Sequence, residues 1–192
     1  MKYIEELRRW IKMQRCQWIE GKPEYYVNYH DHVWGRPEHK DQMLFQWLSL
    51  EIMHIGLSFQ LVLSKKEAFM KAFDNFDIDK VAQFTEKDVT NLMSNPEIIR
   101  HQRKIEAIIC NAQMIQKLQN QWGSFAAYLW HFTNNTSIDA MDDDSACIDL
   151  SQRITKDMKR NGFKFIGSTT IKSYLEGIGI IDGHEFNCDF KH

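Results

Sequence analysis

The stretch KRNGFKFIGSTT at residues 159–170 decides the fold expected for this chain. It has the pattern of a helix end, a tight turn and a new helix start. Gly162 and Gly167 allow a sharp turn because glycine tolerates positive φ angles, and Ser168 is a residue type that caps helices. We therefore expect two helices joined by a hairpin within an all-α fold.

The start of the helix after this hairpin could hold a phosphate group. Its first backbone N–H groups have no partner inside the helix, and the helix dipole places partial positive charge there. Lys159, Arg160 and Lys164 add positive charge nearby. The same residues also fit an ordinary corner between two helices with a glycine C-cap, so the pattern alone leaves both interpretations open.

Helical periodicity extends over most of the remaining sequence, and no run alternates apolar and polar residues as a strand would. Several residue patterns mark helix starts. They are Ser58, the box formed by Thr85 and Asp88, the pair Asn95 and Pro96, and Ser124. The longest expected helices cover residues 41–54, about 96–119, 147–161 and 168–177.

The chain is long enough for one domain, residues 1–192, although two lobes sharing a groove are also possible. Ile4, Leu7 and Ile11 mark one face of a helical N-terminal extension at 1–15. The net charge of −2 creates no strong overall attraction to nucleic acid. Contacts with DNA would therefore depend on a local basic surface and on backbone amides. The acidic loop 133–144 is expected to be solvated.

The sequence favours a cytoplasmic protein without a membrane segment. No apolar stretch approaches the roughly 18–20 residues of a membrane span, and the charged first residues are unlike a signal peptide. The four cysteines are too few and too scattered for a secreted disulfide scaffold. Reduced thiols in the cytoplasm are free to bind metal.

Four potential metal ligands lie at opposite ends of the chain, namely Cys16, His30, His184 and Cys188. They could meet only if the two ends converge. Two thiolates and two imidazoles suit tetrahedral Zn²⁺, and a site with all four positions filled by protein is structural. Their spacing alone is weak support, because isolated cysteines and histidines more often belong to packing or to the surface.

Several collinear segments together resemble one protein family. They are Cys16-Gln17-Trp18, residues 25–35 (YYVNYHDHVWG), Leu50-Glu51 followed by Gly56-Leu57-Ser58, residues 98–108 (IIRHQRKIEAI), the hairpin at 162–167, and His184 with Cys188. The chain is similar in these segments to the DNA-3-methyladenine glycosylase I family, the zinc-containing branch of the helix-hairpin-helix DNA glycosylases. The resemblance implies hydrolysis of an N-glycosidic bond in double-stranded alkylated DNA, with release of 3-methyladenine and one structural Zn²⁺ on the four ligands.

The resemblance also implies a base pocket. Glu51 would be the catalytic residue, and aromatic side chains would hold the base. These are Trp18, Tyr26, Tyr29, Trp34 and Phe59. A base in a duplex must be flipped out before its bond can be cut, and electron-rich rings favour a cationic base over a neutral one. Without the family, the position of Glu51 fits a boundary residue or the partner of a buried basic group better than a catalytic residue.

The expected DNA contacts come from three places. Gly56 and Leu57 would enter the gap left by the flipped base, or would be a helix stop and a core leucine. Arg100 and Lys104, at a helix start, would bind phosphate or be solvated surface charges. The hairpin would contribute Lys164, Gly167, Ser168 and Thr169. We expect a monomer.

The chain departs from the family pattern around Glu51. Ile52, Met53 and Ile55 stand where smaller or amide-bearing residues are more usual, and Phe59 replaces a tryptophan. These changes could alter affinity or specificity. A glycosylase for another modified base, or a zinc-stabilised helical module that binds DNA without catalysis, therefore remain alternatives. Asp182 would act as a catalytic acid or, as we prefer, orient a zinc ligand, as Asp31 would for His30.

Overall fold

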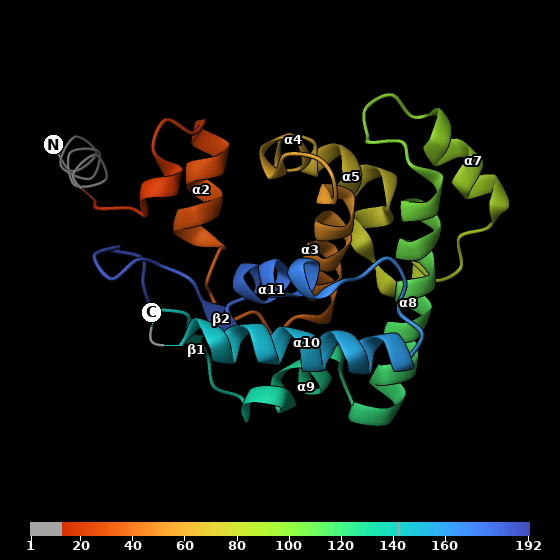
Figure 1. Ribbon diagram of the computed structural model, residues 1–192. Coiled ribbons are helices and arrows are strands. Elements are labelled where there is room, and N and C mark those ends of the chain that lie inside the picture. The colour runs from red at the N-terminus through yellow and green to blue at the C-terminus, as the bar shows by residue number, and fades with distance from the viewer. Residues whose placement is uncertain (1–12, 142) are drawn as a thin grey trace, which may run out of the picture.

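The computed structural model describes residues 13–141 and 143–192, and these residues are mostly helical (Figure 1). This confirms the predicted helical class. The extension marked by Ile4, Leu7 and Ile11 falls mainly on residues 1–12, outside the described part. The two ends of the described chain converge. The backbone N–H groups of Gln14 and Gln17 donate to the side chains of Asp189 and Glu185, with N···O distances of 2.8 and 2.9 Å.

The helical elements follow one another with short connections. The α-helices are α2 (Glu24–His32), α3 (Asp41–His54), α4 (Phe59–Ser64), α5 (Lys66–Ala72), α6 (Ile78–Val81), α7 (Glu86–Ser94), α8 (Gln102–Trp122), α9 (Phe125–Trp130), α10 (Asp144–Arg160) and α11 (Ser168–Gly177). Short 3₁₀ turns are η1 (Gln17–Ile19), η2 (Asp74–Phe76) and η3 (His131–Thr133). The strands β1 (Ile138–Asp139) and β2 (Ile181–Asp182) form a short parallel pair.

Helix α3 is the centre of the core. Every residue at positions 44–53 is buried, as expected for a helix covered on all sides by other helices. It packs against α4, α8, α9 and α11. Its predicted bounds are confirmed. The chain turns after it at Gly56, which has a φ of 77°, and Ser58 caps α4 by accepting a hydrogen bond from the N–H of Leu61.

The stretch at 159–170 joins α10 to α11, which pack against each other (Figure 1). Gly162 has a φ of 94°, which lets the chain leave α10. The turn is held by Asn111 on α8, whose side chain accepts from the N–H of Lys164 at 2.7 Å and donates to its carbonyl oxygen at 3.1 Å. The expected cap at Ser168 is wrong by one residue: the N-cap is Gly167, and Ser168 begins α11.

Helix α8 begins later than Asn95 and Pro96 predict. The side chain of Asn95 accepts from the N–H of Glu97 at 2.9 Å and stabilises a turn, while Ile98 enters the core. The helix starts at Gln102, and His101 caps it. In contrast, the predicted capping box of Thr85 and Asp88 does begin helix α7. The Asp88 carboxylate accepts a hydrogen bond from the N–H of Thr85 at 2.8 Å.

The loop 133–144 is more than a solvated connection. It contains β1, whose Ile138 and Asp139 pair with Ile181 and Asp182 of β2. This pairing ties the C-terminal segment to the body of the protein. Among the helices of the described residues, none is both long enough and apolar enough to cross a membrane.

Candidate active site and metal cluster

Glu51 lies on the buried part of α3, and 8% of its side chain is exposed. Its Oε2 atom is 3.2 Å from Nδ1 of His54, three residues further along the same helix. Burial raises the pKa of Glu51, the His54 hydrogen bond lowers it, and the charge of Glu176 on α11 raises it again. The net shift is upward, because removal of a carboxylate from water disfavours its charged form.

Aromatic rings from α2 and α4 gather close to Glu51. Phe59 lies with ring-centroid distances of 5.2 Å to Tyr29 and 6.1 Å to Tyr26. Burial and, after it, the charge of Glu51 raise the pKa of both tyrosines. The Glu51 carboxylate is therefore close enough to act electrostatically on these rings. The structure thus brings together the acid and three of the predicted base-binding residues.

Trp18 and Trp34 connect this aromatic group to the convergent chain ends. The Trp18 ring is 5.9 Å from Tyr26 and 4.9 Å from Trp34, while Trp34 is 4.6 Å from the His184 ring. The two tryptophans therefore form a wall shared by the candidate base site and the predicted metal site. Trp18 remains partly exposed, so one side of this wall is accessible.

Trp47 and His54 also lie at this site, although neither was predicted from the sequence. Trp47 lies one turn before Glu51 on α3 and packs its ring 5.1 Å from that of Tyr29. The spacing of four residues placed it on the same helix face as Glu51, so the signal was present. The interior position of α3 hid it, because a tryptophan in a buried helix is ordinary core.

A cavity of about 280 Å³ lies beside Glu51. Its lining combines the end of α3 with the first turns of α11, namely Glu51, His54, Ile55, Gly56, Thr169, Thr170 and Ser173. Ile52 and Met53 are fully buried in the core and do not line it. Glu51 and the first turn of α11 therefore border the same cavity. The apolar side chains of Ile52 and Met53 do not fill it.

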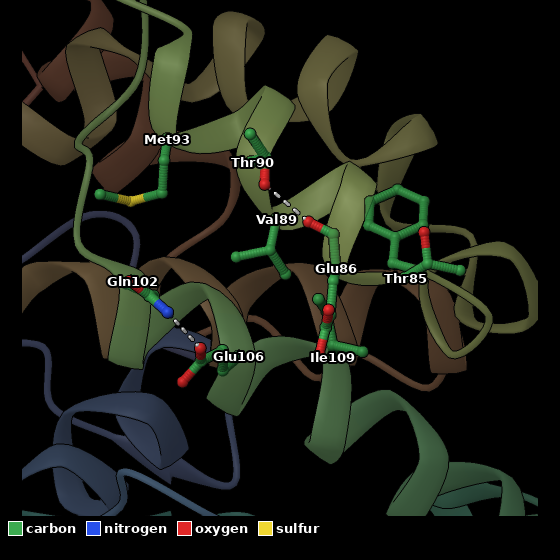
Figure 2. A pocket seen from close by; sticks show the side chains of 9 residues that line it. Thr85, Glu86, Val89, Thr90, Met93, Gln102, Glu106 and Ile109 are labelled. Carbon is green, nitrogen blue, oxygen red and sulfur yellow. Dashed lines mark hydrogen bonds between the residues drawn. The ribbon is translucent and has the colours of Figure 1, made fainter.

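A larger cavity, of about 550 Å³, lies between α7 and α8 and is shown in Figure 2. Its lining includes Val89, Met93 and Ile109, with two internal hydrogen bonds, Thr90 to the Glu86 carbonyl and Gln102 to Glu106. Its two acids, Glu86 and Glu106, are exposed. The buried carboxylate of Glu51 therefore borders the smaller of these two cavities.

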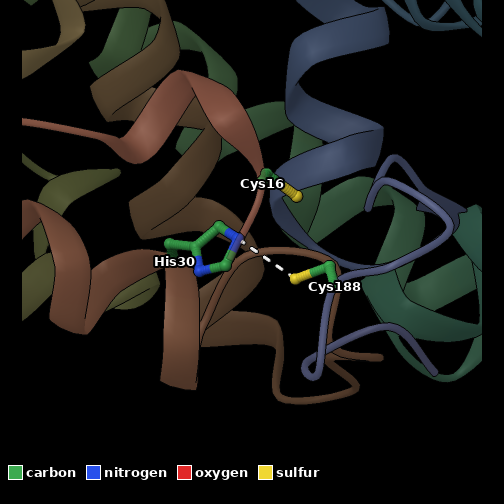
Figure 3. Close-up of side chains that lie close together, drawn as sticks. All are labelled: Cys16, His30 and Cys188. Carbon is green, nitrogen blue, oxygen red and sulfur yellow. Dashed lines mark hydrogen bonds between the residues drawn. The ribbon is translucent and has the colours of Figure 1, made fainter. Parts of the chain in front are cut away.

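Three of the four predicted metal ligands meet at the convergent chain ends. Cys16 Sγ, a ring nitrogen of His30 and Cys188 Sγ lie within 4.8 Å of one another, and all three residues are buried (Figure 3). Cys188 Sγ is 3.6 Å from His30 Nε2. One ion bound at about 2.0–2.3 Å from each ligand spans a similar distance. Burial raises the pKa of the Cys16 thiol, and the nearby Cys188 raises it further, to about 12.

His184 lies beside this group but is not one of the three. Its ring centroid is 5.1 Å from that of His30. Its Nε2 atom is buried and has no hydrogen-bond partner among the described residues. Such a buried, unpartnered imidazole nitrogen is unfavourable unless something binds it. The donor set of two thiols and two imidazoles fits zinc.

Carboxylates orient both imidazoles. Asp31 Oδ1 lies 2.7 Å from His30 Nδ1, and Asp182 Oδ1 lies 2.8 Å from His184 Nδ1. Burial raises the pKa of Asp182, but hydrogen bonds from His184 and the His192 backbone outweigh it and lower the pKa to about 2. Asp31 also accepts from the Arg15 guanidinium at 2.8 Å. These contacts favour the orienting role for Asp182 over that of a catalytic acid.

The candidate DNA contacts are mostly exposed. Lys164, Ser168 and Thr169 lie at the surface around the start of α11. Leu57 is also exposed, so the alternative that it is a core leucine is wrong. Arg100 is exposed as well, in the turn before α8. These side chains are therefore accessible to a macromolecule.

Lys104 is the exception, and its predicted contact with DNA phosphate requires correction. It is 4% exposed, and its Nζ donates to the carbonyl oxygens of Met53 and Ile55 at 3.0 and 2.6 Å. The cation thus stabilises the negative end of α3. The position of Lys104 near a helix start suggested a contact with phosphate, but the side chain points from α8 towards the protein interior.

Comparison with known proteins agrees with this geometry. A family model for methyladenine glycosylases matches residues 18–192. The chain therefore belongs to the methyladenine glycosylase family, as its sequence predicted. It is 36% identical to the DNA-3-methyladenine glycosylase of Haemophilus influenzae, over 92% of this chain and 97% of that protein. It is 35% identical to DNA-3-methyladenine glycosylase 1 of Escherichia coli, over 92% and 96%.

Solved structures share the fold. The 3-methyladenine DNA glycosylase I of Staphylococcus aureus, studied for its recognition of 3-methyladenine, superimposes with a TM-score of 0.85 at 40% identity. The match covers 94% of this chain and 97% of that one. A crystal structure of a 3-methyladenine DNA glycosylase I gives a TM-score of 0.87 at 34% identity, covering 93% and 100%.

Proposed function

We propose that this protein removes 3-methyladenine from alkylated DNA by hydrolysing its N-glycosidic bond. The comparisons confirm the predicted class, a DNA-3-methyladenine glycosylase. The observation that carries the proposal at the level of residues is the buried carboxylate of Glu51, set against the rings of Tyr26, Tyr29 and Phe59.

The geometry suits a cationic purine. Methylation at N3 places positive charge on the base, which makes it a good leaving group, so strong protonation by the enzyme is unnecessary. The π faces of the rings attract this cation. Glu51 accepts a hydrogen bond from the exocyclic amine and places negative charge near the oxocarbenium character that develops on the sugar. Adenine lacks the charge and gains less from both interactions.

Base binding is assigned to the five predicted aromatic residues. Tyr26, Tyr29 and Phe59 lie nearest Glu51, while Trp18 and Trp34 extend the surface towards the chain ends. Phe59 presents less area to the base than the tryptophan usual in the family. The contribution of stacking at this position is therefore smaller, and charge attraction contributes correspondingly more to selectivity.

Double-stranded DNA is the proposed partner, bound through a helix-hairpin-helix formed by α10, its turn and α11. Gly167, Ser168 and Thr169 offer the free N–H groups of the α11 start to a phosphate, and Lys164 adds charge. Arg100 contacts the backbone elsewhere. The exposed turn at Gly56 and Leu57 enters the gap that the flipped base leaves. These contacts suit a protein with little net charge, because they are local.

We further propose one structural Zn²⁺, held by Cys16, His30, His184 and Cys188. The clustering of three ligands and the unpartnered His184 Nε2 support it. The ion would join the chain ends and hold no substrate position. All four cysteines of the chain are unpaired, which fits the reducing cytoplasm that we propose as its location. We propose that residues 1–192 act as one domain and as a monomer.

Incubation with methylated duplex DNA and chromatography of the free bases tests the function. We expect release of 3-methyladenine by the wild-type protein and a loss of roughly 10²–10³-fold for Glu51→Gln. Release of a different modified base would replace the proposed substrate. DNA binding without release of any base would identify a non-catalytic module. Normal release by Glu51→Gln would remove Glu51 from the mechanism.

A further inference from the structure

His54 touches both the acid and the aromatic group of the candidate site. Its Nδ1 lies 3.2 Å from Glu51 Oε2, and its ring meets that of Phe59 at a centroid distance of 5.3 Å and an interplanar angle of 64°. It lines the same cavity of about 280 Å³ as Glu51. The His54 side chain is 34% exposed, compared with 8% for Glu51. The imidazole is therefore the accessible partner of a buried carboxylate.

The charged and titratable groups around this pair come from three other helices. Tyr26 and Tyr29 face Glu51 from α2, and Glu176 faces it from α11. Lys104 of α8 binds the main-chain oxygens on either side of His54. Glu176 is itself paired with Lys172, with an N···O distance of 2.9 Å. The remaining lining from α11, namely Thr169, Thr170 and Ser173, carries no charge.

We propose that His54 is a positioning residue that fixes the Glu51 carboxylate and sets the net charge of the base pocket. This inference rests on the proposed function and adds its regulation by pH. With a neutral imidazole donating its Nδ1 proton to Glu51, the pair carries one negative charge and attracts a cationic base. When the pair takes up one further proton, on either residue, that charge disappears and the attraction is lost.

The chemistry of the two groups supports this behaviour. Imidazole is the side chain whose charge ordinarily changes between about pH 5 and 8. Burial raises the pKa of Glu51, and the hydrogen bond from His54 opposes that rise. His54 therefore also keeps the carboxylate ionised where an isolated buried glutamate would more readily be neutral.

Two substitutions separate positioning from charge. His54→Ala removes the hydrogen bond, and we expect kcat for 3-methyladenine release to fall about 10- to 100-fold at pH 7.5. His54→Gln retains an N–H donor without a titratable group. It should recover most of that loss, while the acidic limb of its pH–rate profile moves to lower pH. His39→Gln is the control, since this exposed histidine stacks on Trp130.

The pair can also be observed without activity. In NMR spectra recorded at pH 7.5, the Nδ1 resonance of the His54 ring should move in Glu51→Gln, which changes its hydrogen-bond partner, and stay unchanged in Glu67→Gln. An unchanged His54 resonance in Glu51→Gln, or a His54→Gln variant as impaired as His54→Ala, would overturn the inference. Wild-type protein that releases no 3-methyladenine at any pH would instead overturn the proposed function. The ring spectra still decide the pairing in that case.

Discussion

The Nζ atom of Lys104 lies 2.6 Å from the carbonyl oxygen of Ile55, so a buried cation joins α8 to the turn that follows the Glu51 helix. The same atom binds the carbonyl oxygen of Met53 at 3.0 Å. Burial lowers the pKa of Lys104, since its charged form has lost water. This contact fixes where α3 ends and therefore where the exposed turn at Gly56 and Leu57 begins.

Replacement of Lys104 by methionine should destabilise the protein by about 2 kcal/mol, because two main-chain acceptors lose a charged donor. The relief of a buried charge offsets part of this loss. Thermal unfolding followed by circular dichroism should show a lower Tm, by roughly 4–8 °C. Lys117→Met is the matched control, since Lys117 is exposed on the same helix. Equal Tm values for the two variants would contradict the role assigned to Lys104.

Glu51→Gln should stabilise the fold at neutral pH. The folded-state pKa of Glu51 is raised, so its stabilising contribution is complete below the unfolded value of 4.5 and is lost as pH rises through the folded pKa. An uncharged amide avoids this loss. Chemical denaturation at several pH values should give the variant a higher unfolding free energy near pH 8 and no advantage below about pH 4.5. Glu67→Gln, at an exposed position, should change little at either pH.

The purified protein should contain about one equivalent of zinc by elemental analysis. Cys188→Ser should lose it and lower the Tm by roughly 10 °C, since the metal would close a loop of 158 positions between His30 and Cys188. Cys110→Ser should keep the metal, because Cys110 lies outside the cluster. Protein that holds no zinc, or a Cys188→Ser variant with unchanged metal content, would contradict the proposed site.

Asn111→Ala should weaken binding to DNA more than binding of the free base. The variant loses both hydrogen bonds that hold Lys164 in the hairpin, at a cost of about 2–3 kcal/mol in stability. The start of α11 is then less fixed. Fluorescence anisotropy with duplex DNA, and quenching of tryptophan by 3-methyladenine, measure the two affinities separately. Asn120→Ala, exposed on the same helix, serves as control, and equal effects on both ligands would argue against a DNA-binding hairpin.

Local sequence rules were sufficient where a single segment determines its own structure. The bounds of α3, the cap at Ser58 and the box at Thr85 all follow from contacts within a few residues. Asn95 and Pro96 gave an equally good local signal and were misleading. The burial of Ile98 requires the chain to continue to His101 before a helix can start, and that requirement comes from the distant core.

The site was predictable to a similar degree. The resemblance selected Glu51 and the residues that cluster around it, because those positions are fixed in one linear pattern. It could not reveal that Lys104 points inward or that His54 holds the acid. The first depends on how α8 packs against the end of α3, and the second on the orientation of two side chains within α3. The β1–β2 pair was likewise invisible, since it joins two-residue segments far apart in the chain.

The meeting of Cys16 with Cys188 has a consequence for biosynthesis. Cys188 follows His30 by 158 positions, so a nascent polypeptide first has only half of the proposed metal donors. It also lacks the His184 ring against which Trp34 packs. Under the proposed function, a translation product that stops before His184 would therefore lack both the clasp and one support of the tryptophan wall.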